Sequence, residues 1–291
     1  MSPGDPLSPD DTDITTYPSF SVPWEIAPAL ADAGYDGCST ASNHSLDRGG
    51  AGVTATLDHL DVAGLGHAGS ARSEEEAATP TMYDVRGVEV GHLAYTEHFN
   101  GNSVPADQPW LVARIDLEKI LADSSALRAA GARIVVVSLH WGSEFVSEPT
   151  DSQEAIAAAL LASPDVDLVI GHHAHVVQPV EQINGEWVAY GLGNFLSNQY
   201  DTTCCPAESQ DGVIAIFHFR EGDDGGFTSE SVEVVPTWVE RPTYRILVAS
   251  DALSQPDLAP STRDALARSL ERTLEVLDRR GGAPTVTEAA A

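Results

Sequence analysis

The stretch VIGHHAHVVQP, residues 169–179, places three of the ten histidines of the chain inside an otherwise apolar run. The apolar residues that precede His172, His173 and His175 predict a buried strand, and the histidines come where that strand ends. A strand-like segment gives up burial energy when it carries imidazole, so a chemical reason for these residues has to be sought.

Helices and strands alternate on the N-terminal side of this stretch. Helical spacing of apolar residues, closed by glycine, is followed each time by a short apolar run that ends in polar residues. We predict helices over 23–34, 51–64, 117–132 and 151–163, and strands over 35–41, 133–142 and 165–175.

Two hairpins and a β-rich C-terminal part complete the pattern. Arg86–Gly87 and Asn184–Gly185 are turn dipeptides between alternating segments, which predicts a hairpin at each. Strands are predicted over 212–219 and 227–239, and an amphipathic helix over 261–280. The alternation predicts an α/β fold with a mixed sheet system between helices.

The 291 residues suffice for one large domain or two small ones. We predict a loop or frayed segment over 1–20, one α/β domain over 21–280 and a loose tail over 281–291. Three cysteines do not make a disulfide framework. Simple thiols are the favoured interpretation of Cys204 and Cys205, and a vicinal disulfide between them is the alternative.

The net charge is −29, from 15 basic and 44 acidic residues. Such a field repels nucleic acid and anionic membrane surfaces, so neither is expected as a partner. It also repels anionic substrates unless cations occupy the site. No apolar run approaches the roughly 20 residues that span a bilayer, and the N-terminus has no signal-peptide pattern.

Polar residues follow three of the predicted strands. Asn43 and His44 follow the first, His140 ends the second, and His173 and His175 end the third. Ligands bind at the carboxyl ends of strands in α/β sheets, so these side chains can converge although they lie far apart in sequence. Histidine with an amide oxygen and without cysteine predicts a site for Zn, Mn, Fe or Ni rather than a closed structural zinc site.

A single histidine is more often a hydrogen-bonded structural residue than a ligand. We give that interpretation to the remaining histidines outside the three strand ends, which are His59, His67, His92, His98 and His218. In a straight strand His173 and His175 would share one face, and this parity argument lapses if the segment has already become a loop.

Three segments resemble the motif blocks of the CapA-type capsule-synthesis, or poly-γ-glutamate synthesis, family. They are ASNHSLDRGGAG at 41–52, VVVSLHWGSEF at 135–145 and VIGHHAHVVQPVEQINGEWVAYGLGNFLSNQ at 169–199, within a similarity that covers about residues 19–220. This family belongs to the calcineurin-like metallophosphoesterase superfamily. The resemblance implies a four-layer α/β/β/α sandwich with two divalent metal ions, such as Mn, Fe or Zn.

The resemblance also assigns roles position by position. Asn43, His140, His173 and His175 match metal ligands, and His44 matches the residue close to the leaving group. Asp47 matches a residue that could orient His44. Glu144 and Asn194 match positions near the ligands or the substrate.

The chain departs from the family at its start. Family members begin with a strand ending in GD and a second ending in NLE, whose carboxylates hold and bridge the metals, and neither is present here. The two ions of the family arrangement are therefore reduced to an expectation of one ion or none in this chain. Either the start codon is assigned too late or the protein is truncated, and a late start would also remove an export signal. The aspartates at positions 5, 10, 11 and 13 lie in a stretch without strand pattern and are not expected to substitute.

The resemblance implies three functional alternatives. The first is metal-dependent hydrolysis of a phosphoester, with little activity in a chain that lacks the bridging carboxylates. The second is a non-catalytic component that binds or exports an anionic polymer such as poly-γ-glutamate, together with capsule-synthesis machinery. The third is amide hydrolysis at the same metal centre. Family members are often associated with the cell envelope or extracellular.

Overall fold

The computed structural model describes residues 5–223, 225–282 and 284–286, and these divide into two compact units between Trp141 and Gly142. Each unit is described by itself below. The sequence prediction of one domain over 21–280 did not include this division. Residues 1–4 of the predicted N-terminal segment, and residues 283 and 287–291 of the predicted tail, lie outside the described residues.

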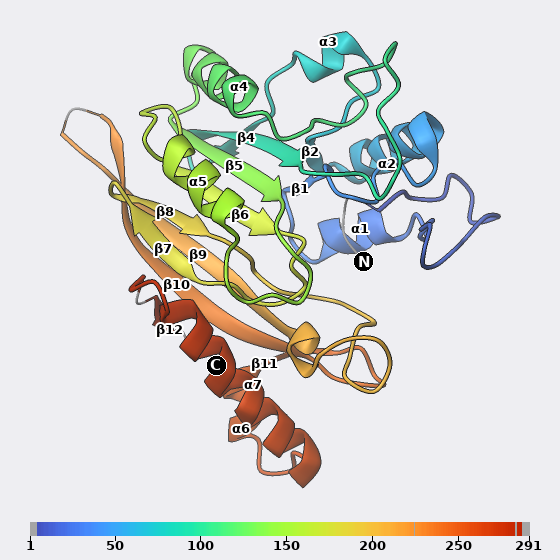
Figure 1. The fold of residues 1–291 in the computed structure, drawn as a ribbon, viewed down its shortest axis with the longest axis vertical. Coiled ribbons are helices and arrows are strands. Elements are labelled where there is room, and N and C mark those ends of the chain that lie inside the picture. The colour runs from blue at the N-terminus through green and yellow to red at the C-terminus, as the bar shows by residue number, and fades with distance from the viewer. Residues whose placement is uncertain (1–4, 224, 283, 287–291) are drawn as a thin grey trace. The chain divides into compact units, whose positions relative to one another are not determined.

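The N-terminal unit opens with helix α1 (Ile26–Asp32) and a small parallel sheet. Strand β1 (Gly37–Ser39) pairs in parallel with β2 (Gly66–Ala68), and helix α2 (Gly49–Ala63) makes the connection between them. Figure 1 shows α2 beside these two strands. Gly64 ends α2 with a φ of 76°, a left-handed conformation in which glycine meets no Cβ penalty.

A second sheet of this unit contains β3 (Met82–Val85), β4 (Val88–Thr96) and β5 (Ile134–His140). The predicted hairpin is confirmed, because β3 and β4 pair antiparallel and Arg86 and Gly87 have φ values of 56° and 85°. Helix α4 (Leu117–Ala129) connects β4 to β5, which pair in parallel up to Thr96 opposite His140. Helix α3 (Glu74–Ala77) is a single turn before β3.

The loop over residues 5–22 is packed onto the N-terminal unit rather than frayed. Leu7 is 4% exposed, and its backbone N–H donates to Thr56 Oγ1 at 2.9 Å. The N–H of Ser8 donates to the carbonyl of Val22 at 2.8 Å. Isolated backbone bridges of this kind leave no periodic pattern in a sequence, which is why the frayed alternative stayed open.

Two glycines that pair across β1 and β2 leave room for the ring of Tyr83. Gly37 pairs with Gly66, and a Cβ added at Gly37 would lie 2.0 Å from Tyr83 Oη. Burial raises the pKa of Tyr83 to about 12. The absence of side chains at these two positions is therefore a packing requirement.

We expect Gly37→Ala to destabilise the protein by about 1–3 kcal/mol, because the new methyl group must displace the Tyr83 ring. Chemical denaturation of wild type and variant measures this difference. Gly50→Ala is the matched control, since its nearest neighbour would be the flexible side chain of Leu111 at 3.3 Å. Equal stability of Gly37→Ala and wild type would contradict this account of the glycine pair.

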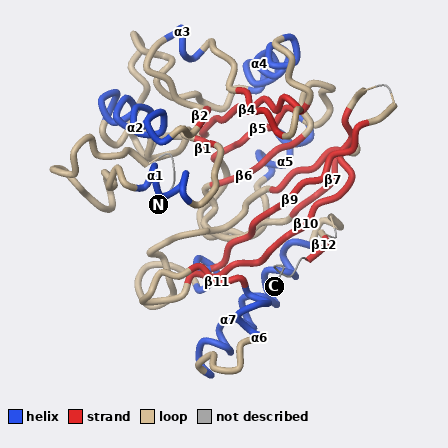
Figure 2. The backbone as a smooth tube through the Cα atoms, turned by 180° about the vertical axis from the view of Figure 1, so that it is seen from behind, coloured by secondary structure: helices blue, strands red, loops and turns tan. Residues whose placement is uncertain are grey.

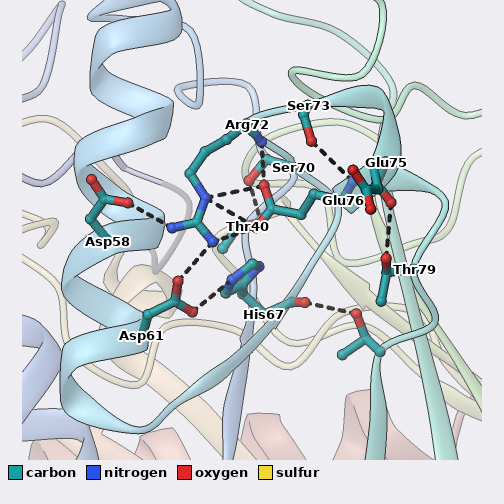
Figure 3. Close-up of polar contacts among 11 residues, drawn as sticks. Thr40, Asp58, Asp61, His67, Ser70, Arg72, Ser73, Glu75, Glu76 and Thr79 are labelled. Carbon is teal, nitrogen blue, oxygen red and sulfur yellow. Dashed lines mark hydrogen bonds and ion pairs between the residues drawn. The ribbon is translucent and has the colours of Figure 1, made fainter.

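An arginine surrounded by acids fixes the loop that follows β2. Figure 3 shows the Arg72 guanidinium between Asp58 and Asp61 of α2 and Glu76 of α3. It lies 2.6 Å from Asp58 Oδ1 and 2.7 Å from Asp61 Oδ2. Although burial opposes it, the Arg72 guanidinium lowers the pKa of Glu76. The cluster therefore joins α2 to α3.

The C-terminal unit begins with a loop and helix α5 (Asp151–Leu160), which carries a capping box of Thr150 and Gln153. Strand β6 (Leu168–His172) pairs in parallel with β8 (Glu186–Ala189), and β7 (Val180–Ile183) pairs antiparallel with β8. The predicted hairpin at Asn184–Gly185 is confirmed, with φ values of 55° and 97°.

A long antiparallel hairpin and a C-terminal helix form the rest of this unit. Strands β9 (Asp211–Glu221) and β10 (Phe227–Val239) pair along their length, and both views show α7 (Pro260–Asp278) beside them (Figures 1 and 2). The remaining elements are short: η1 (Ala207–Gln210), β11 (Ile246–Val248), α6 (Ala249–Ser254) and β12 (Thr285–Val286).

The cysteines differ from the favoured interpretation. Cys204 and Cys205 form a vicinal disulfide in the loop before β9, which was the alternative, while Cys38 is a buried free thiol. The two cysteines are adjacent in the sequence, so their disulfide closes no long loop and no spacing pattern in the sequence predicts it. Burial raises the pKa of Cys38 to about 11, so this thiol is protonated at neutral pH. Among the described helices, none has the length and apolar character that crossing a bilayer requires.

Candidate metal and catalytic residues

The loop after β1 and the end of β5 meet within the N-terminal unit. Asn43 Oδ1 lies 3.0 Å from His140 Nε2, and the two residues are 4% and 7% exposed. The contact has the length of a hydrogen bond, and it brings together an amide oxygen and an imidazole nitrogen, two atom types that bind divalent cations. The N-terminal unit thus brings Asn43 and His140 together.

His44 is held by a buried carboxylate. Its Nδ1 lies 2.7 Å from Asp47 Oδ2, and the Asp47 side chain is 3% exposed. The backbone N–H of Phe20 donates to the same oxygen at 2.8 Å, and the Phe20 ring meets the imidazole edge-on at a centroid distance of 4.6 Å. A carboxylate on Nδ1 fixes both the orientation of a histidine and its tautomer. His44 therefore presents Nε2 away from Asp47.

Asn100 is a residue of this site that the sequence reasoning missed. Its Nδ2 lies 3.2 Å from His44 Nε2, and its Oδ1 accepts from Asn43 Nδ2 at 3.3 Å. The residue has a φ of 50° in the loop after β4. The rule that polar residues beyond strand ends converge would have found it, had the segment FNGN at 99–102 been weighed.

Short serine and threonine contacts shape the loop that carries Asn43. Ser45 Oγ donates to the carbonyl of Thr40 at 2.7 Å and accepts from the N–H of Ser42 at 2.8 Å. Ser70 Oγ donates to Thr40 Oγ1 at 2.6 Å, which ties the loop to the segment fixed by Arg72 (Figure 3). Because these contacts already fix the backbone of the loop, its side chains need little further ordering when they bind a ligand.

The second group of residues lies in the C-terminal unit, where β6 ends at His172. His173 and His175 follow with φ values of 93° and 57°, which bulky residues rarely adopt. The strand parity argument therefore lapses, and the left-handed backbone, not the pleat, sets where the two imidazoles point. Such strain costs about 1–3 kcal/mol per residue and clusters at functional sites.

Glu144, His173 and His175 form a group that could hold a metal ion. Each offers one ligand atom, and these atoms all lie within 4.8 Å of one another. His173 is buried, His175 half-buried and Glu144 exposed. The neighbouring Phe145 has a φ of 61°, and its N–H donates to the carbonyl of Ala174 at 2.7 Å. This bond holds the Glu144 segment against the histidine turn.

Asn194 fixes His175 from the other side. Its Oδ1 lies 3.0 Å from His175 Nδ1, and its Nδ2 donates to the carbonyl of Ser209 at 2.9 Å. An outer partner on one ring nitrogen leaves the other, Nε2, as the ligand atom. The preceding Gly193 has a φ of 71°, and a Cβ there would lie 2.4 Å from the Asp211 carbonyl. Close backbone approach thus positions Asn194.

Two buried glutamines support the loop of Glu144. Gln153 Nε2 donates to Gln178 Oε1 at 2.9 Å, and Gln178 Nε2 donates to the carbonyl of Val146 at 2.9 Å. Gln153 and Gln178 are 1% and 0% exposed. Buried polar groups that satisfy each other rigidify a segment, so this pair holds the loop that carries Glu144.

The remaining histidines and aspartates have structural contacts. Desolvation lowers the pKa of His172 to about 4, so it is neutral at physiological pH. The histidines predicted as structural include His67 at 3.2 Å from Asp61, His92 at 2.9 Å from Ser138 Oγ and His218 at 2.9 Å from Glu233. Among the N-terminal aspartates, Asp13 pairs with Arg48 and Asp11 accepts from the N–H of Trp24.

Comparison with known proteins identifies a family whose profile covers the candidate site residues. The profile of the family described as bacterial capsule synthesis protein PGA_cap matches residues 5–199. The chain is 28% identical over 221 residues to the PGA biosynthesis protein CapA of Bacillus subtilis (strain 168), covering 72% of this chain and 54% of that protein. The chain spans about half the length of the curated relatives it matches.

One solved structure supports the fold. A Staphylococcus aureus protein named as a 5′-nucleotidase, in complex with α-ketoglutarate, has a TM-score of 0.51 at 16% identity and covers 85% of this chain and 44% of its own. A calcineurin-like phosphoesterase, YfkN from Bacillus subtilis, has a TM-score of 0.48 at 14% identity, covering 86% of this chain and 74% of its own. The predicted metallophosphoesterase-like α/β fold class is confirmed.

Proposed function

The chain belongs to the bacterial capsule synthesis protein family PGA_cap, and from this premise we propose that it is a metal-dependent hydrolase of capsule-polymer synthesis. The observation that carries the proposal is the group of Glu144, His173 and His175, whose ligand atoms lie within 4.8 Å of one another. Phosphoester hydrolysis is the proposed reaction, and an anionic polymer such as poly-γ-glutamate is the proposed product of the machinery that the protein serves.

The donor sets fit divalent metal ions. One set is Asn43 and His140, and the other is Glu144, His173 and His175. Imidazole, amide and carboxylate donors without thiolate suit Mn, Fe or Zn. When bound, such ions supply a Lewis acid and a water of lowered pKa. They would also offset locally the −29 charge that otherwise repels an anionic substrate.

His44 has the geometry of a proton donor. Asp47 Oδ2 lies 2.7 Å from Nδ1, so Nδ1 would keep its proton and donate it in a hydrogen bond to the carboxylate, and Nε2 would be the nitrogen that exchanges protons with a ligand. Asn100 Nδ2 lies 3.2 Å from Nε2 and 3.4 Å from Nδ1, so this amide lies beside the ring rather than in line with Nε2. His44 would donate a proton from Nε2 to the departing oxygen, while Asp47 stabilises the positive ring.

The test is hydrolysis by the purified chain, loaded with Mn, Fe or Zn, of p-nitrophenyl phosphate and of γ-linked glutamate peptides. We expect slow phosphoester cleavage, and we expect the double variant His173→Ala, His175→Ala to fall to the rate measured without added metal, because two candidate metal ligands are gone. His218→Ala is the control, since that histidine pairs with Glu233 on the β9–β10 hairpin.

Each other outcome favours one alternative. Cleavage of the γ-linked peptide without phosphoester cleavage would indicate amide hydrolysis. A metal-loaded protein that is inert on both substrates yet binds the peptide would indicate the polymer-binding role. Either result would overturn the phosphoesterase proposal.

A further inference from the structure

The segment from Asn194 to Tyr200 joins the candidate metal group of the C-terminal unit to an arginine. At one end Asn194 contacts His175, and its Nδ2 donates to Gln199 Oε1 at 3.1 Å. At the other end the carbonyl of Ser197 accepts from Arg241 Nη1 at 3.3 Å. Asn198 Oδ1 accepts from Arg241 Nη2. The same short segment therefore positions both a metal ligand and a cation.

Two tyrosines hold the Arg241 guanidinium in place. Its Cζ lies 3.9 Å from the ring centroid of Tyr244 and 4.4 Å from that of Tyr200, distances typical of cation–π contacts. Tyr244 Oη donates to Asn198 Oδ1 at 2.8 Å, so one amide ties the arginine and the tyrosine together. Tyr244 has a φ of 57°, a strained conformation for an aromatic residue that the fold maintains here.

The hydrogen-bond partners of the Arg241 guanidinium are neutral groups. Among the described residues, no carboxylate is paired with it, whereas Arg245, Arg272, Arg279 and Arg280 of the same unit all have acidic partners. The adjacent Glu240 is engaged elsewhere, since hydrogen bonds from Thr243 and then Arg245 lower its pKa. Arg263 of the same unit also donates to carbonyls, those of Leu253 and Gln255, without a carboxylate partner among the described residues. What sets Arg241 apart from Arg263 is its place against two tyrosine rings.

The arginine keeps donors for a ligand. A guanidinium has five N–H donors, and each terminal nitrogen has two, of which the contacts to Ser197 and Asn198 use one apiece. One N–H on each terminal nitrogen therefore remains for an acceptor such as a carboxylate, which forms strong charge-assisted hydrogen bonds with a guanidinium. A single guanidinium among neutral neighbours matches a monoanion better than a phosphate dianion, which usually recruits more cations.

Exposed apolar side chains occur in this segment and in the turn that follows Arg241. Phe195, Leu196 and Tyr244 are 38%, 39% and 45% exposed. An unbranched chain that alternates carboxylates with methylene groups would use both kinds of surface, since its carboxylates suit Arg241 and its methylenes suit the exposed apolar side chains. Phe195 and Leu196 directly follow Asn194 in the sequence.

We propose that Arg241, held by Tyr200 and Tyr244, is a specificity-determining residue that binds a carboxylate of an anionic polymer at the edge of the His175 site. This inference rests on the proposed function, to which it adds that the substrate carries repeated carboxylates besides the phosphoester that is cleaved. It assigns Arg241 to binding and not to the chemical step.

The probe is a fluorescently labelled γ-linked oligoglutamate, titrated against the whole chain without added metal. We expect Arg241→Met to weaken binding by about tenfold or more, because a charge-assisted contact is lost. Arg241→Lys should fall between the two, since it keeps the charge and loses the planar guanidinium. Arg245→Met is the matched control, with the same charge change on an exposed residue of the same turn, and should bind within about twofold of wild type.

Thermal unfolding of each variant separates lost binding from lost folding, and Arg241→Lys keeps the test valid if Arg241→Met unfolds. Wild-type affinity in both Arg241 variants, or no binding of the oligomer to wild type, would overturn the proposal. Inorganic phosphate as a competitor is the second arm. Binding of phosphate through Arg241 without binding of the oligomer would replace carboxylate by phosphate and also overturn it.

The failures of the two proposals are distinguishable. If Arg241 binds the oligomer but no substrate is cleaved, only the hydrolase proposal fails. If p-nitrophenyl phosphate is cleaved equally by wild type and Arg241→Met and neither binds the oligomer, only the Arg241 proposal fails.

Discussion

Replacing His44 with alanine is expected to lower kcat for metal-dependent phosphoester hydrolysis by about 10²–10⁴-fold, the usual contribution of a positioned general acid. The reason is the 2.7 Å contact with Asp47, which orients the ring and leaves Nε2 as the proton-exchanging atom. Steady-state kinetics with two phosphoesters, one with a p-nitrophenyl and one with an alkyl leaving group, measures the effect. The loss should be larger for the alkyl ester, because its departing oxygen needs the proton more.

The controls separate proton transfer from structure. His67→Ala is matched to His44→Ala, since His67 also contacts an aspartate, at 3.2 Å, but belongs to the Arg72 cluster. We expect it to leave kcat within about twofold of wild type. Asp47→Asn should lower kcat while metal content is unchanged. An equal loss for both leaving groups in His44→Ala would contradict the role of His44 as proton donor.

Replacing Arg272 with methionine is expected to destabilise the protein by about 3–5 kcal/mol, because it leaves a buried carboxylate without its partner. Asp211 is 2% exposed, and its Oδ1 accepts from Arg272 Nη2 at 2.7 Å and from Ser269 Oγ at 2.6 Å. The pair joins α7 to the first residue of β9. Chemical denaturation at neutral pH measures the loss. The double variant Arg272→Met, Asp211→Asn should regain most of the stability.

The pH dependence has a defined sign. Burial raises the pKa of Asp211, even though Arg272 and Ser269 act in the opposite direction. A carboxyl whose folded pKa exceeds its unfolded value contributes stability that is present below the unfolded pKa and is lost as the pH rises through the folded pKa. Without Arg272 the folded pKa rises further, so the deficit of Arg272→Met should shrink as the pH falls below that value. A deficit that grows on acidification would contradict this account.

The regular elements could be predicted from the sequence because local chemistry determines them. Gly64 beyond α2 and the turns at Arg86–Gly87 and Asn184–Gly185 are single-residue signals with a steric cause. The apolar run that became β5 also carried enough information to place His140 at a strand end. The third strand was predicted over 165–175, whereas β6 ends at His172.

What the sequence could not supply are contacts that leave no periodic trace. The left-handed backbone of His173 and His175 lies among contacts of Phe145 and Asn194. Histidine is enriched in that conformation among non-glycine residues, but no local pattern assigns it to these two positions. Asn100 follows the end of β4, so the strand-end rule marks it as a candidate, but its contact with His44 depends on a loop whose shape no local pattern specifies. The packed segment 5–22 and the division after Trp141 have the same cause, since both depend on contacts distant in sequence.

The most direct test of the central claim, that these residues hold divalent metal, is metal content. The chain is equilibrated with Mn, Fe or Zn, dialysed and analysed by atomic emission, in parallel with His140→Ala and with His173→Ala, His175→Ala. We predict that wild type retains stoichiometric metal, that each variant loses part or all of it, and that His218→Ala retains as much as wild type. Wild type that retains no metal, or variants that retain as much as wild type, would contradict the account.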